Sequence, residues 1–365
     1  MDKTIKKLKL IDLGYSDFFE DNRKSTVDNT LTPARIISEH KELYVLRNET
    51  SELSAKITGK MMFTALSRED YPAVGDWVLI TILDKKQAII REILPRKTVL
   101  IRKSASRSAT QIIASNIDTA FIIQSPDRDY NLNRFERYLS LAESGNIKPV
   151  IVLNKTDLIS ESDLELKLDE LKTRFKNTDI YTTSTVTGKG SADFKRNIKL
   201  GVTYCFIGSS GVGKSSIINM LIGENLIKTG EISSYTNRGK HVTSHRELFI
   251  LEKGGLLIDN PGMREIGVLD SEAGIQNVFS EIHDLSIKCK FSNCTHINEP
   301  NCAVLGAINS GMLDKERYDN YIKLLKENEY NTMTKLEKRK EDYKFGKFIK
   351  TAKKQIKKYK IDFDR

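Results

Sequence analysis

The sequence lacks any long apolar run, and this absence argues against a membrane span. None of the hydrophobic stretches in its 365 residues approaches the roughly 18–20 residues that cross a bilayer. The first residues also lack an uninterrupted apolar stretch and a small-residue cleavage site, so they do not have the pattern of a signal peptide. We therefore expect a cytoplasmic protein with no membrane partner.

Cysteine is scarce, and the few cysteines are unevenly placed. Three of the four, Cys289, Cys294 and Cys302, lie close together beside His296. In a cytosolic chain such a cluster favours metal binding over disulfides. Three thiolates and one imidazole form a closed tetrahedral set that suits one structural Zn²⁺ and leaves no position open for catalysis. Cys205 lies apart in an apolar segment, where we expect it in a hydrophobic core.

The chain has no internal repeat, and its composition is that of a soluble multidomain protein. Hydrophobic residues make up 39% and charged residues 30% of the sequence, which is typical of globular domains. The formal net charge of +10 favours a polyanionic partner, because Lys and Arg release condensed counterions when they bind phosphates.

The N-terminal third of the chain has the pattern of a small barrel. Residues 1–32 form a polar extension, and residues 33–103 contain short apolar segments separated by turn residues. This pattern predicts an antiparallel β-barrel, either OB-like, as in many nucleic-acid-binding modules, or of another small type. We expect strands around Ile36 and at residues 43–46, 61–66, 77–82 and 87–90.

The pattern changes after a polar linker at residues 103–108. Between residues 104 and 275, buried strands alternate with helices, which predicts an α/β domain with a mostly parallel sheet. Strands are expected near Tyr181 and at residues 117–124, 149–153, 202–207 and 256–258, and helices at residues 134–144 and 162–175. Residues 276–365 are predicted to be a helical zinc-binding domain that ends in a basic tail.

A phosphate-binding loop follows the strand at residues 202–207. The run matches the P-loop pattern and comprises Gly208, Ser209, Ser210, Gly211, Val212, Gly213, Lys214 and Ser215. Its glycines let backbone N–H groups converge on the β-phosphate at a helix N-terminus. Lys214 supplies a cation to the β- and γ-phosphates, and the Ser215 hydroxyl is expected to bind Mg²⁺.

The base is indicated by Asn154, Lys155, Thr156 and Asp157, which end a buried strand. An Asp carboxylate there can accept hydrogen bonds from the N1–H and exocyclic amine of guanine, a pair of donors that adenine lacks. We expect Asp157 to select guanine, Asn154 to bridge the base edge and the P-loop, and the Lys155 stem to cover the ring face. The pattern predicts binding of GTP and GDP.

A second phosphate-sensing element is expected after the strand at residues 256–258. Asp259 is expected to reach Mg²⁺ through water, and the backbone amide of Gly262 to bond the γ-phosphate. Thr243, in the loop between the P-loop and this element, is the candidate for completing Mg²⁺ coordination, with Thr236 and Ser244 as alternatives.

The residue that would orient the attacking water is not obvious. Many GTPases carry glutamine after the glycine of this element, whereas this chain has Met263. A thioether cannot orient water, so hydrolysis requires another residue or a partner. His241 is the candidate catalytic residue, and a surface histidine near the phosphates is the alternative.

The order of these motifs is circularly permuted. An ordinary GTPase runs from P-loop to switches to base-reading motif, whereas here the base-reading motif comes first. Because the termini of a doubly wound fold lie close together, joining them and cutting elsewhere preserves the site. The cut falls after residues 259–262, so the nucleotide state is expected to reach the C-terminal domain through residues 263–268.

With barrel, permuted GTPase and zinc cluster in series, the whole chain resembles the ribosome small-subunit-dependent GTPase family of bacteria, known as RsgA or YjeQ. The matching segments are residues 114–118, 131–139, 208–216, 239–241 and 317–318. The resemblance implies a late maturation factor that binds the 30S subunit and its 16S rRNA and hydrolyses GTP, with Mg²⁺, when docked. It also implies a catalytic role for His241, a nucleotide contact for Ser216 and a base contact for Ser184. We expect a monomer.

Two other functions fit parts of the sequence. A permuted GTPase acting on the large subunit is disfavoured by the zinc cluster and the upstream barrel. An RNA-binding protein that uses GTP mainly as a structural ligand is kept as an alternative because Met263 cannot orient the attacking water. The tail from Lys338 to Lys360, with its interleaved aromatic residues, fits either extra rRNA contacts or a solvated helix.

Overall fold

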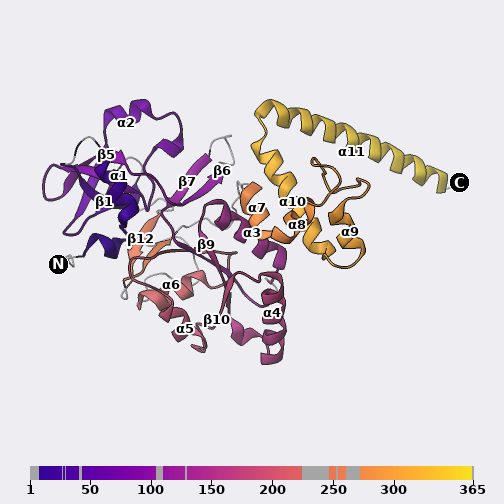
Figure 1. The fold of residues 1–365 in the computed structure, drawn as a ribbon, viewed down its shortest axis with the longest axis horizontal. Coiled ribbons are helices and arrows are strands. Elements are labelled where there is room, and N and C mark those ends of the chain that lie inside the picture. Colours follow the sequence, from indigo (N-terminus) through magenta and orange to yellow (C-terminus); the bar gives the residue numbers. More distant parts are fainter. Residues whose placement is uncertain are drawn as a thin grey trace.

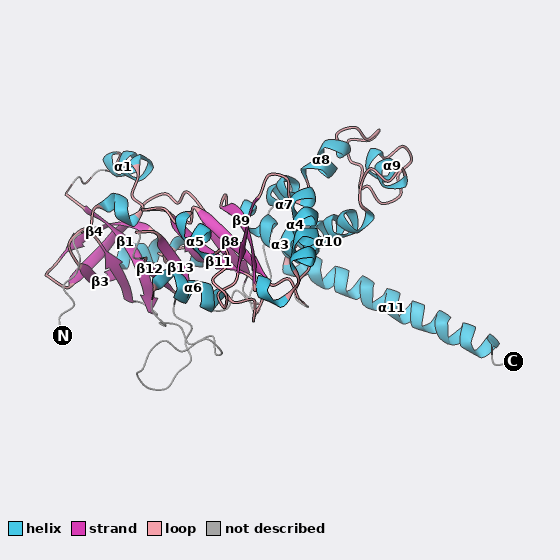
Figure 2. Ribbon diagram, turned by 90° about the horizontal axis from the view of Figure 1, so that it is seen from below, coloured by secondary structure: helices cyan, strands magenta, loops and turns pink. Residues whose placement is uncertain are grey.

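The barrel, the α/β domain and the helical domain follow one another along the long axis of the molecule (Figure 1). The structure is a computed structural model, which describes residues 8–26, 28, 30–40, 43–103, 110–127, 130–223, 246–251, 254–259 and 272–363. The N-terminus lies at the barrel end, and the C-terminal helix points away from the body at the other end in both views (Figures 1 and 2).

The N-terminal barrel is a closed ring of five strands. These are β1 (Thr32–His40), β2 (Leu43–Arg47), β3 (Glu52–Ile57), β4 (Trp77–Ile82) and β5 (Gln87–Ile93). β1 pairs with both β2 and β4, and β3 runs parallel to β5, which closes the ring in the order β1-β2-β3-β5-β4. The helices α2 (Gly59–Thr64) and η2 (Arg68–Asp70) connect β3 to β4. The predicted OB-like barrel is confirmed.

The predicted strand at residues 61–66 is wrong, because most of this segment forms α2. The Thr58 side chain caps the helix by accepting a hydrogen bond from the backbone N–H of Met61, a local signal that the apolar residues obscured. Phe63 and Leu66 are 91% and 97% exposed, so their apolar character does not reflect a place in the barrel core. The strand of this region is β3, which precedes α2.

The N-terminal extension covers one side of the barrel. It contains η1 (Leu10–Leu13) and α1 (Asp17–Lys24). Leu13 and Phe19 are buried with Trp77 in a small hydrophobic cluster, and Tyr15 meets the Trp77 ring edge-on. The extension is therefore packed against the barrel, although its composition is polar.

The central domain contains a five-stranded parallel sheet in the order β10-β9-β8-β11-β13. Its strands are β8 (Thr119–Gln124), β9 (Lys148–Asn154), β10 (Asp179–Thr183), β11 (Thr203–Ile207) and β13 (Leu256–Asp259), and β12 (Glu247–Ile250) pairs antiparallel with β13. The helices are α3 (Leu132–Ser144), η3 (Thr156–Leu158), α4 (Glu161–Arg174), α5 (Ser191–Arg196) and α6 (Lys214–Ile222). Strands covered on both faces are continuous apolar runs, which is why the sequence predicted them closely.

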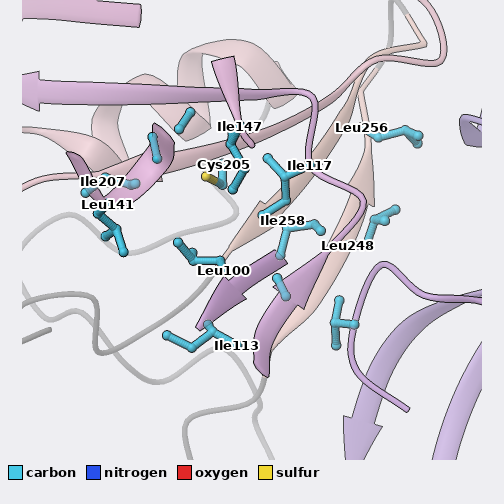
Figure 3. Packing of buried hydrophobic residues seen from close by; sticks show 14 of the residues in the cluster. Leu100, Ile113, Ile117, Leu141, Ile147, Cys205, Ile207, Leu248, Leu256 and Ile258 are labelled. Carbon is cyan, nitrogen blue, oxygen red and sulfur yellow. The ribbon is translucent and has the colours of Figure 1, made fainter. Parts of the chain in front are cut away.

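The barrel and the central domain share one sheet and one core. β12 pairs with β1 at Glu247 and Ser38, so the two sheets join. The hairpin of β6 (Val99–Lys103) and β7 (Thr110–Ser115) spans the predicted boundary at residue 103. Figure 3 shows Leu100 and Ile113 of this hairpin in the same hydrophobic cluster as Ile258 of β13.

The C-terminal domain is helical, as predicted. It contains α7 (Glu272–Val278), α8 (Ser280–Ser286), α9 (Ala303–Asn309), α10 (Lys315–Thr332) and α11 (Lys335–Phe363). Ile275, Phe279 and Leu324 are buried in its own hydrophobic cluster, and α7 packs against α3 of the central domain. Within the described ranges, no helix has the length and apolar character needed to cross a membrane.

Candidate functional site

The predicted nucleotide-binding segments meet at the carboxyl edge of the parallel sheet. The P-loop follows β11, the base-reading motif follows β9, and Ser184 follows β10. Asp259 is the last residue of β13, which pairs with β11. This edge is where open α/β sheets bind ligands. Segments far apart in the chain therefore converge on one surface of the domain.

The P-loop wraps around the start of α6. The Lys214 ammonium donates hydrogen bonds to the carbonyl oxygens of Gly208, at 2.6 Å, and of Ser209. Ser215 and Ser216 lie in the first turn of α6, whose orphan N–H groups and dipole favour an anion. Gly208 lies so close to β8 that an added Cβ would approach the Ile123 carbonyl oxygen to 2.3 Å.

The base-reading motif is hydrogen-bonded to the P-loop. Asn154 is fully buried, and its Nδ2 donates to the carbonyl oxygen of Val212 at 2.9 Å. Its Oδ1 accepts a 2.9 Å hydrogen bond from Thr183 Oγ1. Gly213 has a φ of +93°, and an added Cβ there would lie 2.2 Å from Asn154 Nδ2. Asn154 is therefore hydrogen-bonded to the P-loop, as one half of its predicted bridge to the base edge, and this contact requires glycine at position 213.

Asp157 and Ser184 lie side by side at the same edge. The buried Ser184 hydroxyl donates to Asp157 Oδ1 at 2.5 Å, while Asp157 itself is exposed. Lys155 has a left-handed backbone conformation, with φ of 62°. The Ser184 contact orients the Asp157 carboxylate, and the residue stays exposed and able to accept further hydrogen bonds.

Part of the predicted site lies outside the described residues. This holds for His241, Thr243 and Gly262, as well as for Thr236, Ser244, Met263 and the segment at residues 263–268. Asp259 is described and is half-buried. In the register of the sheet, Cys205 of β11 lies opposite Ile258 of β13. The next residue of β13, Asp259, therefore lies beside the end of β11 that leads into the P-loop.

The cysteine cluster has the dimensions of a zinc site. The ligand atoms of Cys289, Cys294, His296 and Cys302 all lie within 4.8 Å of one another. The Sγ atoms of Cys289 and Cys302 are 3.8 Å apart, and His296 Nδ1 lies 3.6 Å and 3.4 Å from them. Ligand-to-zinc distances of about 2.3 Å for sulfur and about 2.0 Å for nitrogen give tetrahedral separations of about 3.8 Å and 3.5 Å. The four residues fit one structural zinc ion.

The surroundings of the cluster support that use. Burial lowers the pKa of His296, which favours the neutral imidazole that a metal requires. The backbone N–H of Leu305 donates to Cys302 Sγ at 3.5 Å, and Tyr318 Oη donates to the His296 carbonyl oxygen at 2.6 Å. Cys205 differs, because complete burial raises the pKa of its thiol to about 12; it belongs to the core, as predicted.

Two residues near the nucleotide edge were missed from the sequence. Thr183 is hydrogen-bonded to Asn154. The feature of the sequence that could have indicated this contact is the run of hydroxyl residues at positions 182–185. Arg134, at the start of α3, donates a 3.0 Å hydrogen bond from Nη1 to Ser209 Oγ in the P-loop. Arg134 lies in the segment at residues 131–139, but nothing in that segment indicates a contact with a loop 75 residues away.

Comparisons with known proteins agree with this geometry. Residues 93–269 match the model of the RsgA GTPase family. The chain is 37% identical over 345 residues, 94% of its length, to "Small ribosomal subunit biogenesis GTPase RsgA 1" of Bacteroides thetaiotaomicron, of which 96% is covered. It is 40% identical over 323 residues to "Small ribosomal subunit biogenesis GTPase RsgA 2" of Lactiplantibacillus plantarum, covering 88% of this chain and 91% of that one.

Solved structures give the same result. The crystal structure of YjeQ from Thermotoga maritima superposes with a TM-score of 0.62 at 27% identity, covering 82% of this chain and 98% of that one. YloQ, described as a circularly permuted GTPase, superposes with a TM-score of 0.61 at 26% identity, covering 83% and 97%. The chain therefore belongs to the RsgA GTPase family and is a GTP-hydrolysing enzyme of circularly permuted fold.

Proposed function

We propose that this chain hydrolyses GTP to GDP and phosphate during late maturation of the 30S ribosomal subunit, and that the docked subunit stimulates hydrolysis. The observation that carries the nucleotide assignment is the 2.9 Å hydrogen bond from Asn154 to the P-loop carbonyl of Val212. It brings the base-reading and phosphate-binding motifs into one site. The small-subunit partner is supported by the names of the relatives in two bacteria.

The roles of the described residues follow from their chemistry. Asp157 accepts hydrogen bonds from guanine, Ser184 orients Asp157, and the Lys155 stem covers the ring. The P-loop residues predicted from the sequence, together with Ser216, surround the phosphates. Ser215 and Asp259 bind Mg²⁺, directly and through water respectively. Zinc holds the C-terminal domain together and takes no part in the reaction.

Three roles fall on residues outside the described ranges. Thr243 completes the Mg²⁺ shell, the Gly262 amide bonds the γ-phosphate, and His241 orients the attacking water. We also propose a monomer that acts in the cytoplasm and binds 16S rRNA through the barrel and the zinc domain. The net charge of +10 supports a polyanionic partner of this kind. The functional units that we propose are residues 1–32, 33–103, 104–275 and 276–365, with the β6–β7 hairpin and α7 lying across the boundaries at residues 103 and 275.

The test is GTP turnover measured with and without purified 30S subunits, with 50S subunits as the control particle. Stimulation by 30S alone is expected. Co-sedimentation with 30S should be stronger with a non-hydrolysable GTP analogue than with GDP. Tight GTP binding without turnover in any condition would instead support an RNA-binding protein that uses GTP as a structural ligand, and stimulation by 50S alone would reassign the partner.

A further inference from the structure

Arg134 brings a second cation to the P-loop from a neighbouring helix. Its Nη1 donates a 3.0 Å hydrogen bond to the side chain of Ser209, the second residue of the loop. The Lys214 ammonium donates to the backbone carbonyl of the same residue. Two positively charged side chains therefore hold Ser209, where the loop leaves β11.

The backbone of Arg134 is fixed relative to that loop. Gln124 is fully buried at the end of β8, the strand next to β11. Its side-chain amide exchanges two hydrogen bonds with the backbone of Asn131, at 2.8 Å and 3.0 Å. The Asn131 side chain in turn accepts a 2.9 Å hydrogen bond from the backbone N–H of Arg134 and caps α3. The first turn of α3 is thereby tied to the sheet beside the P-loop.

The other side of α3 carries the zinc-binding domain. Successive helical residues turn by about 100°, so Arg134 and Glu136 point to nearly opposite sides of the helix. Asn133 lies three positions before Glu136 and shares its side. Asn133 Nδ2 donates a 3.0 Å hydrogen bond to Glu316 of α10. α3 thus contacts the P-loop on one side and α10 on the other, and Figure 1 shows α3 and α10 as neighbours.

Glu136 is the centre of a buried ion cluster between the two domains. Its side chain is fully buried, and Oε1 accepts hydrogen bonds from Arg174 Nε at 2.8 Å and Arg317 Nη1 at 3.0 Å. Oε2 accepts one from Asn320 Nδ2 at 2.5 Å. Burial by itself would lower the pKa of Arg174, but the hydrogen bond to Glu136 raises it overall. Removing the Glu136 carboxylate would leave two largely buried arginines, Arg174 and Arg317, without the acceptor that they share, so the cluster fixes α10 on α3.

The same stretch of α10 also supports the zinc site. Arg317, which donates to Glu136, is followed by Tyr318, which donates to the carbonyl oxygen of the predicted zinc ligand His296 at 2.6 Å. A continuous set of directional contacts therefore leads from the zinc cluster through α10 and α3 to the P-loop.

We propose that Arg134 is a positioning residue for GTP hydrolysis, and that the zinc-binding domain holds Arg134 in place through the buried Glu136 cluster. Arg134 fixes Ser209 and, with it, the first residues of the P-loop around the Lys214 ammonium. A shift of α10 then reaches the P-loop through α3, by a route separate from residues 263–268. The inference rests on the proposed nucleotide site.

The first experiment measures GTP hydrolysis without ribosomes for Arg134→Ala, Ser209→Ala and the double variant. Arg134→Ala should lower kcat about tenfold while KM for GTP and the Kd for GDP stay within about threefold, because positioning and not binding is lost. The double variant should be no slower than the slower single variant, because both changes remove the same bond. Arg134→Lys, which keeps the charge, should recover part of kcat.

The second experiment tests the connection to the zinc-binding domain. Glu136→Gln and Arg317→Lys should each lower kcat by a similar factor, and neither should lower it further in an Arg134→Ala background. Glu327→Gln is the matched control. It breaks a 2.6 Å ion pair with Arg137 between the same two helices, but that pair is partly exposed, and kcat should not change. Zinc content and Tm are measured for every variant.

Two results would overturn the proposal. One is an Arg134→Ala enzyme with kcat within twofold of wild type; the other is full multiplication of the Arg134 and Glu136 effects, which would make the two residues independent. If Glu136→Gln does not fold, Arg317→Lys decides the second point. A wild-type protein without 30S stimulation would contradict the proposed function, whereas kcat measured without ribosomes still tests this inference.

Discussion

At the scale of single residues, the guanine selection proposed for Asp157 depends on the orientation of its carboxylate. Asp157 is exposed, but the buried Ser184 hydroxyl holds one of its oxygens at 2.5 Å. The carboxylate therefore points in a set direction before any base is bound, which lowers the entropy cost of recognition. A side chain with the same shape and a different donor pattern should change the base that is preferred.

Asp157→Asn should weaken GTP binding by about 100-fold, or about 2.7 kcal/mol, because the amide cannot accept both hydrogen bonds from guanine. Xanthosine triphosphate should bind the variant better than GTP does, since xanthine has a carbonyl oxygen in place of the exocyclic amine. Titration of a fluorescent nucleotide with each competitor measures both effects. Asp169→Asn, on the exposed surface of α4, should change neither affinity, and an equal loss for both nucleotides would refute the specificity role.

At the scale of structural elements, the site depends on the junction between the P-loop and the base-reading motif. Gly213 and Gly211 both have left-handed backbone conformations, with φ of +93° and +85°. They differ in their surroundings: an added Cβ at Gly213 would lie 2.2 Å from Asn154 Nδ2, whereas one at Gly211 would have no atom of the described residues within 4 Å apart from its chain neighbours. Substituting each glycine in turn therefore distinguishes the effect of backbone strain from the effect of a steric clash with Asn154.

Gly213→Ala should lower GTP affinity by at least about tenfold, because the new methyl group displaces Asn154 from the P-loop in addition to straining the backbone. Gly211→Ala should destabilise the protein by about 1–2 kcal/mol from backbone strain alone and reduce GTP affinity much less. Isothermal titration and thermal unfolding of both variants provide the comparison. Similar affinity losses would show that the contact with Asn154 is unimportant.

The zinc-binding domain is the second element with a clear prediction. Its hydrophobic cluster includes Cys302, so the metal ligands and the core are parts of one unit. Chelation of zinc, or Cys302→Ser, should unfold α7 to α10 with a loss of helical signal in circular dichroism. The sheet of the central domain has a separate core and should still bind GTP.

Zinc stoichiometry by mass spectrometry under native conditions gives the direct readout. Cys205→Ser is the control, because this thiol is buried in another cluster; it should retain one zinc ion per chain. Retention of the helical signal after complete removal of zinc would contradict a structural role for the metal.

At the scale of the whole molecule, one buried arginine joins three parts of the chain. Arg35 of β1 donates hydrogen bonds to the carbonyl oxygens of Leu13, Gly75 and Asn116. These residues belong to the N-terminal extension, the barrel and the start of the central domain. Burial lowers the pKa of Arg35 to about 10, so it stays protonated at neutral pH and keeps all its donors.

Arg35→Met should destabilise the protein by about 3 kcal/mol, since three buried carbonyl groups lose their donors. Urea denaturation followed by Trp77 fluorescence measures the change, because Trp77 is buried in the cluster that also contains Leu13. Arg91→Met, on an exposed part of β5, should cost less than about 0.5 kcal/mol. An equally small loss of stability for Arg35→Met would show that Arg35 does not hold the three parts of the chain together.

The parts of the fold that are most deeply buried were the easiest to predict from the sequence. β8, β9 and β11 are covered on both faces, so they appear in the sequence as continuous apolar runs and were located within two residues. β3 of the barrel buries only Leu53 and Ala55, and so weak an alternation could not be distinguished from a loop. The neighbouring α2 was mistaken for a strand because Met61, Met62 and Phe63 form a short apolar run, although Phe63 is exposed and Met61 is the one that packs against the core.

The sequence by itself was enough to predict the phosphate-binding loop, the guanine motif and the four metal-binding residues, because each is built from residues close together in the chain. Only the tertiary structure decided which side chains support them. Asn154 meets Val212 across 58 residues, Arg134 meets Ser209 across 75, and Glu136 meets Arg317 across 181. Contacts over such separations depend on how strands and helices are ordered in space, and no local pattern of polar and apolar residues specifies that order.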